Sequence, residues 1–276
     1  MTVVGVNTFP YAWNTPAIDS VRRLADMGYR SFELVCHPPH LPLESYDAGS
    51  RRELSALLDR VGAVHSSVNL PSLDHNLASP WPQMRDFSVE QFRQTIDLAS
   101  DIGISCVVVV PGRLSPLVPA GMEERTAFLR GCIERLLPHA QSRGVRLAIE
   151  NVPMAAFPDA GTLGTFVRSI GSRDVGVCYD LANAHFYGED PAAGLRELAD
   201  LIQVVHVSDT TRTVWRHDPI GMGDVPYAGI PAVLEQIGYD RAIMLEIIDP
   251  DPEGAIISSH DLLVQAGYPE CTGASV

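Results

Sequence analysis

Short apolar runs alternate with longer amphipathic stretches along the whole of this 276-residue chain. The apolar runs predict strands near residues 3–9, 31–35, 63–70, 105–110, 146–152, 175–181, 203–208 and 243–248. Most of these runs are apolar at consecutive positions rather than at alternate ones. That pattern is typical of strands that are buried on both faces of a parallel sheet.

The stretches between the runs have the period of an amphipathic helix. Val89, Phe92, Ile96 and Ala99, for example, recur at intervals of three and four residues. A glycine follows most of the predicted helices just before the next strand, at positions 28, 62, 103, 144, 171 and 238. Glycine adopts the left-handed conformation that ends a helix without a steric penalty, so these positions mark helix ends.

Strand and helix alternate eight times, which predicts an α/β fold in the form of a (β/α)8 TIM barrel. A doubly wound sheet is the alternative, but it would bring only some of the strand ends together. No linker or change of composition divides the chain. We therefore expect a single TIM-barrel domain over residues 1–276, with a frayed tail over residues 268–276.

The composition excludes several partners and chemistries. A net charge of −14 argues against a nucleic-acid partner, and no run reaches the roughly 20 apolar residues of a membrane span. All 20 basic residues are arginine, which excludes Schiff-base and P-loop chemistry because both need a lysine amine. The five cysteines indicate reduced, buried thiols, and the start of the chain has no secretory signal, so we expect a cytoplasmic protein.

Four predicted strands in the second half of the chain each end in a residue that can bind a divalent metal ion. The runs are LAIE, VCYD, VVH and IMLE, and their last residues are Glu150, Asp180, His206 and Glu246. A charged residue at the end of a buried strand is costly unless it faces a cation. Asp180 could instead cap the next helix, and His206 could be a hydrogen-bonded core histidine. Because a barrel brings its strand ends to one face, we expect the four to bind one Mn²⁺, Mg²⁺, Co²⁺ or Zn²⁺ ion.

Other polar residues close to the predicted strand ends are candidates for binding a substrate. They are Glu33, Asn183, His185, Asp209, Arg212 and His217. Glu33 ends the second strand and could accept a hydrogen bond from a substrate hydroxyl or pair with an arginine. Asn183 and His185 could bind substrate or cap a helix. The last three belong to the long loop after the seventh strand, and long loops of compact domains are usually functional.

The chain resembles the xylose isomerase-like superfamily of sugar phosphate isomerases and epimerases over nearly its whole length. The motifs that carry the resemblance are NLAS (76–79), DLASDIG (97–103), LAIENV (147–152), VCYDLANA (177–184), HVSD (206–209), IGMGDVPY (220–227) and IMLEI (243–247). The resemblance implies that the four strand-end residues bind a single divalent ion, often Mn²⁺, and that the protein forms a homo-oligomer. Arg212 matches the arginine with which ketose 3-epimerases hold substrate. Those epimerases have a substrate-binding histidine where this chain has Asn183.

The expected function is that of a metal-dependent sugar isomerase or epimerase, which moves a proton through a metal-stabilised enediolate. Glu150 and Glu246 would remove and return the proton. A dehydratase or other lyase acting on a keto-sugar, a keto-inositol or a dehydroshikimate-like substrate would share the first half of that reaction. An apurinic endonuclease needs a further histidine at the end of the fourth strand, where this chain reads Val110-Pro111-Gly112. A non-catalytic binding barrel is the remaining alternative.

Overall fold

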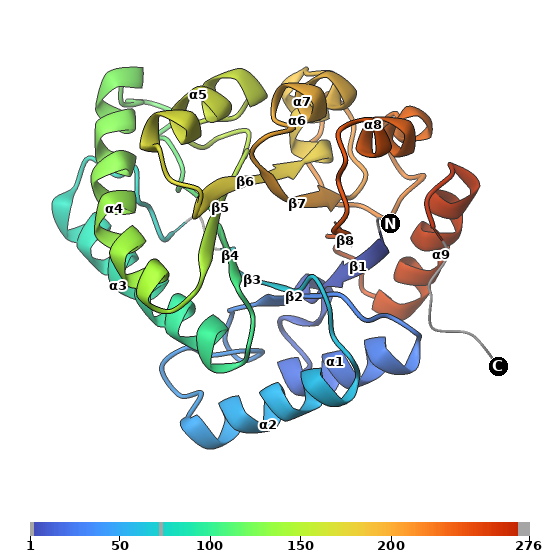
Figure 1. Ribbon diagram of the computed structural model, residues 1–276. Helices are drawn as coiled ribbons and strands as arrows, with labels where there is room; N and C mark the ends of the chain where they lie inside the picture. Colours follow the sequence, from blue (N-terminus) through green and yellow to red (C-terminus); the bar gives the residue numbers. More distant parts are fainter. Residues whose placement is uncertain (1–2, 72–73, 270–276) are drawn as a thin grey trace.

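The computed structural model describes residues 3–71 and 74–269, and it shows a closed barrel of parallel strands surrounded by helices (Figure 1). The strands are β1 (Val3–Asn7), β2 (Phe32–Val35), β3 (Ser67–Leu70), β4 (Cys106–Val109), β5 (Arg146–Glu150), β6 (Val175–Asp180), β7 (Ile202–Val207) and β8 (Ala242–Leu245). Each strand pairs with the next along the chain, and β1 pairs with β8, so that Val3 lies opposite Ala242. The predicted TIM barrel is confirmed, and the doubly wound alternative is wrong.

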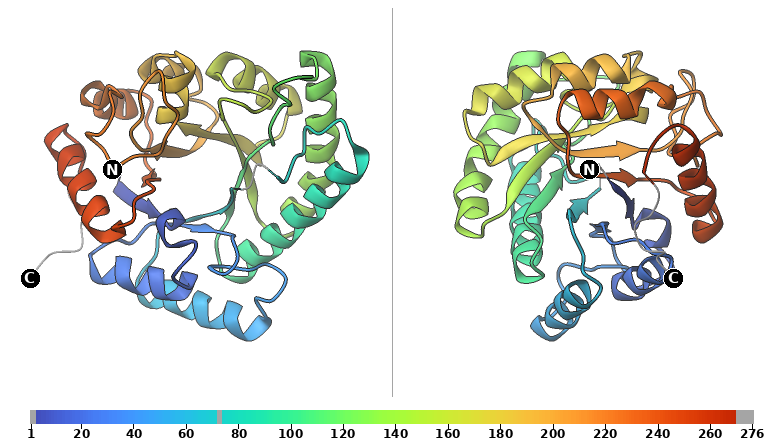
Figure 2. Two further views of the ribbon diagram at one scale, coloured as in Figure 1. Left: turned by 180° about the vertical axis from the view of Figure 1, so that it is seen from behind. Right: turned by 45° about the vertical axis from the view of Figure 1, so that its right-hand side comes forward.

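Helices between the strands form the outer ring, which Figure 2 shows from behind and from the side. They are α1 (Ala17–Asp26), α2 (Ala48–Arg60), α3 (Pro82–Asp101), α4 (Met122–Ser142), α5 (Ala160–Ile170), α6 (Leu181–Tyr187), α7 (Pro191–Glu197), α8 (Ile230–Gln236) and α9 (Pro252–Gln265), with short 3-10 turns at Phe9–Tyr11 and Tyr227–Gly229. Within the described ranges, every helix is too short or too polar to cross a membrane.

Glycines end the helices at the positions that the sequence predicts. The six glycines from position 28 to position 238 that were expected at helix ends have φ values between 67° and 99°. One strand boundary differs from the prediction, because β3 begins at Ser67 and not near residue 63. His65 has φ 50°, which breaks the extended backbone, and its side chain is exposed ahead of the strand.

The lower part of the barrel interior is filled by small and medium-sized side chains. They are Cys106, Val108, Ala148, Cys178, Val204, Ala242 and Met244, and all are buried. Gly5 leaves room for this filling, because a β-carbon at position 5 would lie 2.6 Å from Met244 Sδ. A second and larger apolar core lies between the strands and the helices. The barrel is therefore closed below its upper rim, and a site can form only at its ends.

Cys36, Cys106, Cys132 and Cys178 are free and buried, as expected, whereas Cys271 lies outside the described residues.

The predicted start of the frayed tail at residue 268 is too early, because Tyr268 is only 4% exposed and packs in the core. The rest of that predicted tail, residues 270–276, lies outside the described part of the chain.

Candidate metal centre and active site

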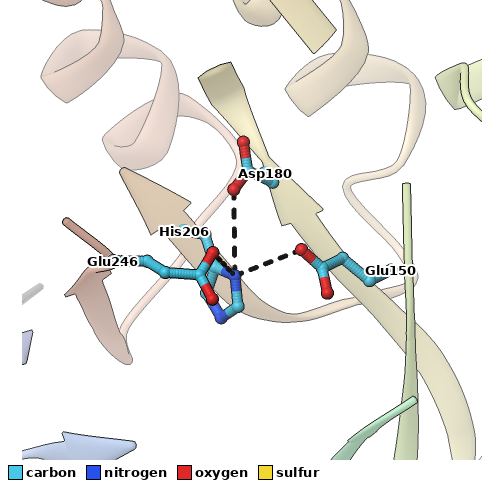
Figure 3. Close-up of side chains that lie close together, drawn as sticks. All are labelled: Glu150, Asp180, His206 and Glu246. Carbon is cyan, nitrogen blue, oxygen red and sulfur yellow. Dashed lines mark ion pairs between the residues drawn. The ribbon is translucent and has the colours of Figure 1, made fainter. Parts of the chain in front are cut away.

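Glu150, Asp180, His206 and Glu246 converge at the carboxyl end of the barrel, and each is at most 5% exposed. Figure 3 shows the three carboxylates grouped around the His206 ring. His206 Nδ1 lies 3.0 Å from Glu246 Oε2, 3.5 Å from Glu150 Oε1 and 3.9 Å from Asp180 Oδ2. Residues that are up to 96 positions apart in sequence thus form one compact cluster.

The two-residue period of a strand explains why these four side chains meet. Ala148, Cys178, Val204 and Met244 fill the barrel interior, and each precedes one of the four residues by two positions. Residues two apart on a strand point to the same face, so all four charged side chains also point inward, one layer higher. Pairing of β6 with β7 places Asp180 directly beside His206.

The buried atoms of this cluster fit a divalent metal ion. Four of them lack a hydrogen-bond partner of good geometry among the described residues, namely Asp180 Oδ2, the two ring nitrogens of His206 and Glu246 Oε2. One candidate ligand atom from each of the four residues lies within 4.8 Å of all the others. Metal–ligand bonds of about 2.1 Å would put neighbouring ligand atoms roughly 3.0 Å apart and opposite ones roughly 4.2 Å apart. Three carboxylates and one imidazole could therefore bind one divalent ion here.

The charges of the cluster point to the same conclusion. Burial raises the pKa of Glu150 to about 7, and the charges of Glu246 and Asp180 add to the rise. Burial likewise raises the pKa of Asp180 to about 6. Burial is also the largest single influence on Glu246 and acts in the same direction, but the charge and hydrogen bond of His206 and the charge of His217 together outweigh it and lower the pKa of Glu246 to about 2. Without a cation the cluster retains protons, and a divalent ion would replace them.

Glu33 lies behind His206 and determines how the imidazole is presented. Glu33 Oε1 lies 2.8 Å from His206 Nε2, and both side chains are completely buried. A carboxylate in this position favours a proton on Nε2, which leaves the lone pair of Nδ1 for a metal ion. Asn7 links the same carboxylate to the cluster, because its Nδ2 donates to Glu33 Oε1 at 2.6 Å and to Glu246 Oε1 at 3.1 Å.

Asp180 caps a helix and keeps a second oxygen that could bind a metal ion, so the two roles that its position in the sequence left open are compatible. Its Oδ1 accepts a hydrogen bond of 2.6 Å from the backbone N–H of Asn183 and so caps α6. Its Oδ2 lies in the cluster and has no hydrogen-bond partner in the part of the chain that the structure describes. A carboxylate has two acceptor oxygens, so helix capping and metal binding do not compete here.

A cavity of about 520 Å³ opens above the cluster. Its lining residues are Phe9, Asn69, Pro71, Val110, Glu150, Val152, Asn183, Trp215, Arg216, His217, Asp218, Glu246 and Ile248. The polar groups gather around the two glutamates, and apolar and aromatic side chains form much of the remaining wall. A cavity of this size with a few convergent polar groups is typical of a small-molecule site.

Two of the predicted substrate-binding residues, Asn183 and His217, line this cavity. Asn183 Nδ2 lies 3.5 Å from Glu150 Oε1, and its Oδ1 accepts a hydrogen bond of 2.6 Å from Trp215 Nε1. His217 Nδ1 lies 3.5 Å from Glu246 Oε2. The substrate-binding roles of both remain predictions.

Two other candidates hold the loop after β7 in place. The Asp209 carboxylate accepts hydrogen bonds from the backbone N–H groups of Thr210, Gly221 and Val225. His185 Nε2 lies 2.8 Å from Asp224 Oδ1, on the same loop. Both Asp209 and His185 are at most 5% exposed, and neither lines the cavity.

The remaining two candidates, Arg212 and Glu33, also lie outside the cavity lining. The Arg212 guanidinium is exposed and donates a long hydrogen bond of 3.4 Å to the backbone oxygen of Glu189. Arg216, four residues later, is the arginine that lines the cavity. We expected Glu33 to accept a hydrogen bond from a substrate hydroxyl or to pair with an arginine. Its neighbours among the described residues are instead His206 and three neutral hydrogen-bond donors.

The sequence places Asn7 and Asn69 among the polar strand ends and Trp215 and Arg216 in the polar loop after β7, but none of the four was chosen as a site residue. Asn7 and Asn69 occur near strand ends, as the four charged residues do. A buried amide, unlike a buried charge, is compatible with burial without a cation, so it does not by itself indicate a site. The two loop residues carry no comparable signal, because the path of a long loop decides which of its side chains face inward.

The fold and the buried cluster define a class of TIM-barrel proteins with a site at the carboxyl end of the strands that could bind a divalent metal ion. The model of the Xylose isomerase-like TIM barrel family matches residues 21–266, and the chain belongs to that family.

Three known proteins illustrate how far the similarity extends. The uncharacterized protein MJ1311 of Methanocaldococcus jannaschii is 26% identical over 235 residues, which cover 82% of this chain and 78% of that protein. A probable endonuclease 4 of Acholeplasma laidlawii is 27% identical over 193 residues, which cover 64% of this chain and 63% of that protein. The crystal structure of a D-tagatose 3-epimerase-like protein has a TM-score of 0.83 at 24% identity, covering 96% and 97% of the two chains. At that identity the likeness is one of fold.

Proposed function

We propose that this protein is a metal-dependent isomerase or epimerase of a small keto-sugar, with Mn²⁺ as the ion that its ligand set suits best. The observation that carries the proposal is the convergence of Glu150, Asp180, His206 and Glu246 at the floor of a sugar-sized cavity, with four buried atoms that have no hydrogen-bond partner among the described residues. Oxygen-rich sites with one imidazole suit Mn²⁺. The likeness in fold to a D-tagatose 3-epimerase-like protein agrees with a sugar substrate.

The two glutamates are placed to move a proton. Glu150 and Glu246 both line the cavity, and they come from β5 and from the residue after β8, which are separated by two strands of the barrel. A divalent ion, when bound, polarises a substrate carbonyl and acidifies the neighbouring C–H bond. Glu150 would take up that proton and Glu246 would return one, and Asn183 would orient Glu150 through its amide. Return to the opposite face of the same carbon is epimerisation, and return to the adjacent carbon is isomerisation.

A lyase is the second candidate, and the position of His217 favours it. The His217 ring lines the cavity 3.5 Å from Glu246 Oε2. From there it could protonate a departing β-hydroxyl after Glu150 has removed the proton. Such a reaction would lose water, so the product distinguishes it from an epimerase.

Two observations oppose a nuclease function despite the endonuclease relative. The described residues contain one group of three or more side chains that could hold a metal ion, and Val110 stands at the end of β4 on the cavity wall. The net charge of −14 repels a phosphate backbone.

The cytoplasmic location and the homo-oligomer remain predictions from the sequence.

The test combines metal content with hydrogen exchange. Purified protein is analysed for metals, reloaded with Mn²⁺ and incubated with a panel of ketoses and keto-cyclitols in D₂O. We expect about one ion per chain and solvent deuterium at the carbon beside the carbonyl of one substrate, with its epimer or isomer as product.

The variants Glu150→Gln and Glu246→Gln should lose exchange. Glu235→Gln, at an exposed position on α8, is the matched control and should behave as wild type. A loaded protein that incorporates no deuterium into any member of the panel would refute the proposed function. Loss of water without epimer formation would move the lyase ahead.

A further inference from the structure

Asn69 lines the cavity and carries a buried hydrogen-bond acceptor that has no partner among the described residues. The residue lies in β3, is completely buried and belongs to the cavity lining. No donor among the described residues lies within hydrogen-bond reach of its Oδ1. An unpaired buried acceptor is unfavourable, so a ligand that donates to it would bind more tightly.

Glu33 fixes which end of the Asn69 amide faces the cavity. Asn69 Nδ2 donates to Glu33 Oε1 at 2.9 Å. The same carboxylate accepts from Asn7 Nδ2 at 2.6 Å and from Ser67 Oγ at 2.5 Å, and it lies 2.8 Å from His206 Nε2. An ionised carboxylate only accepts, so a flipped amide would set two oxygens against each other. The Asn69 oxygen is therefore held away from Glu33.

We propose that Asn69 is a substrate-binding residue whose Oδ1 accepts a hydrogen bond from a substrate hydroxyl, with Glu33 as the positioning residue that holds its amide. This inference rests on the proposed function and narrows its substrate class. The ligand carries a hydroxyl besides those that flank its reacting carbonyl, and a C–H face to pack on the apolar wall. That wall includes Val110, Val152 and Trp215. A polyhydroxy ketone with an open-chain or ring C–H face has both features.

The geometry distinguishes Asn69 from other buried unpaired groups. Ser31 Oγ is also buried without a partner among the described residues, but Ser31 does not line the cavity. Removing it should not affect a ligand in the cavity. Ser31→Ala is thus a control for Asn69→Ala, since it deletes an unpaired polar group of the barrel away from the cavity, whereas Asn69→Ala deletes the unpaired Oδ1 together with the Nδ2 donor to Glu33.

The test uses the ketose that the Mn²⁺-loaded wild type exchanges fastest, together with its monodeoxy analogues. Asn69→Ala should lower kcat/KM for the parent ketose roughly three- to ten-fold, which is the contribution of one neutral hydrogen bond. Wild type should discriminate against one monodeoxy analogue by a similar factor, and Asn69→Ala should not discriminate between that analogue and the parent. Ser31→Ala should retain the wild-type pattern. Mn²⁺ affinity, measured by calorimetry, should stay within about two-fold in both variants because neither residue is a predicted ligand.

Two results would overturn the inference, and they can be told apart. If wild type and Asn69→Ala discriminate equally against every monodeoxy analogue, Asn69 does not bind a hydroxyl, and the proposed function stands. If the Mn²⁺-loaded wild type exchanges no ketose, the proposed function fails and this inference fails with it.

Discussion

Replacing Glu33 by glutamine should weaken Mn²⁺ binding about ten-fold and leave the fold intact. Glutamine has the shape of glutamate, so its amide oxygen could keep the contacts of Oε1 with Asn7, Asn69 and His206. Its NH₂ group could donate to Ser67, because a serine hydroxyl can turn and accept. The substitution thus removes a negative charge from behind His206 and little else.

The magnitude follows from the contact between Glu33 and His206. Their side chains are 0% exposed, and Oε1 lies 2.8 Å from Nε2. The contact is an ion pair by distance; taken at the strength of a hydrogen bond to a charged partner it would contribute about 1.5–3 kcal/mol, against about 0.5–1.5 kcal/mol for a contact between neutral groups. The difference is about 1–1.5 kcal/mol, and each 1.4 kcal/mol corresponds to roughly a factor of ten in affinity. That is the lower end of the ten- to hundred-fold range typical for removing the partner of a metal-binding histidine.

Isothermal titration of chelator-treated protein with Mn²⁺ at pH 8 measures the effect, and circular dichroism checks the fold. Ser67→Ala is the control, because Ser67 donates to Oε2 and not to the oxygen that faces His206. It should change the affinity less than about three-fold. If Glu33→Gln binds Mn²⁺ as wild type does while His206→Gln does not bind, then the charge of Glu33 does not support the metal ligand and the reasoning is refuted.

Three further outcomes are expected. Burial raises the pKa of Glu150 from 4.5 to about 7 and of Asp180 from 3.8 to about 6, so the folded metal-free protein holds more protons than the unfolded chain in this window. It should lose a few kcal/mol of stability as pH rises from about 5 to 8; melting temperatures in chelator test this, and a flat profile, or one unchanged in Glu150→Gln, would contradict it. Arg216→Gln should raise KM roughly three- to ten-fold and Arg212→Gln less than two-fold, because only Arg216 lines the cavity; steady-state kinetics with the reverse order would favour the assignment made from the sequence. Asp209→Asn should cost about 1–3 kcal/mol in urea unfolding, since three backbone N–H groups depend on its carboxylate; unchanged stability would mean that the loop is anchored elsewhere.

The barrel and the convergence of the four strand-end residues could be predicted because local pattern and fold symmetry determine both. Residues two apart on a strand point to the same face, so Glu150 lies above Ala148 and Glu246 above Met244 in the barrel interior. The carboxyl ends of all the strands of a barrel lie at the same face. The environment of Glu33 could not be predicted in this way. Its four neighbours come from β1, β3 and β7, and no local pattern states which inward-facing side chains touch across a barrel.

The loop after β7 shows a second limit. The family resemblance favoured Arg212 over Arg216, but the path of the backbone places Arg216 in the cavity lining. That path depends on the Asp209 carboxylate and on the contact between His185 and Asp224. Residues that sequence analysis assigned to substrate thus determine which neighbour reaches the cavity, and their effect on a ligand would be indirect.

The charges around the cavity indicate whether the substrate carries a phosphate group, which the composition of the chain does not. Four carboxylates, those of Glu33, Glu150, Asp180 and Glu246, lie in contact with one imidazole. A single divalent ion leaves two of their negative charges uncompensated, and the hydrogen-bond donors around Glu33 are neutral. Arg216 is the one arginine of the cavity lining, and its side chain is 63% exposed and 3.8 Å from Asp218. Such a field disfavours a phosphate ester, so an uncharged ketose should be exchanged faster than its own phosphate.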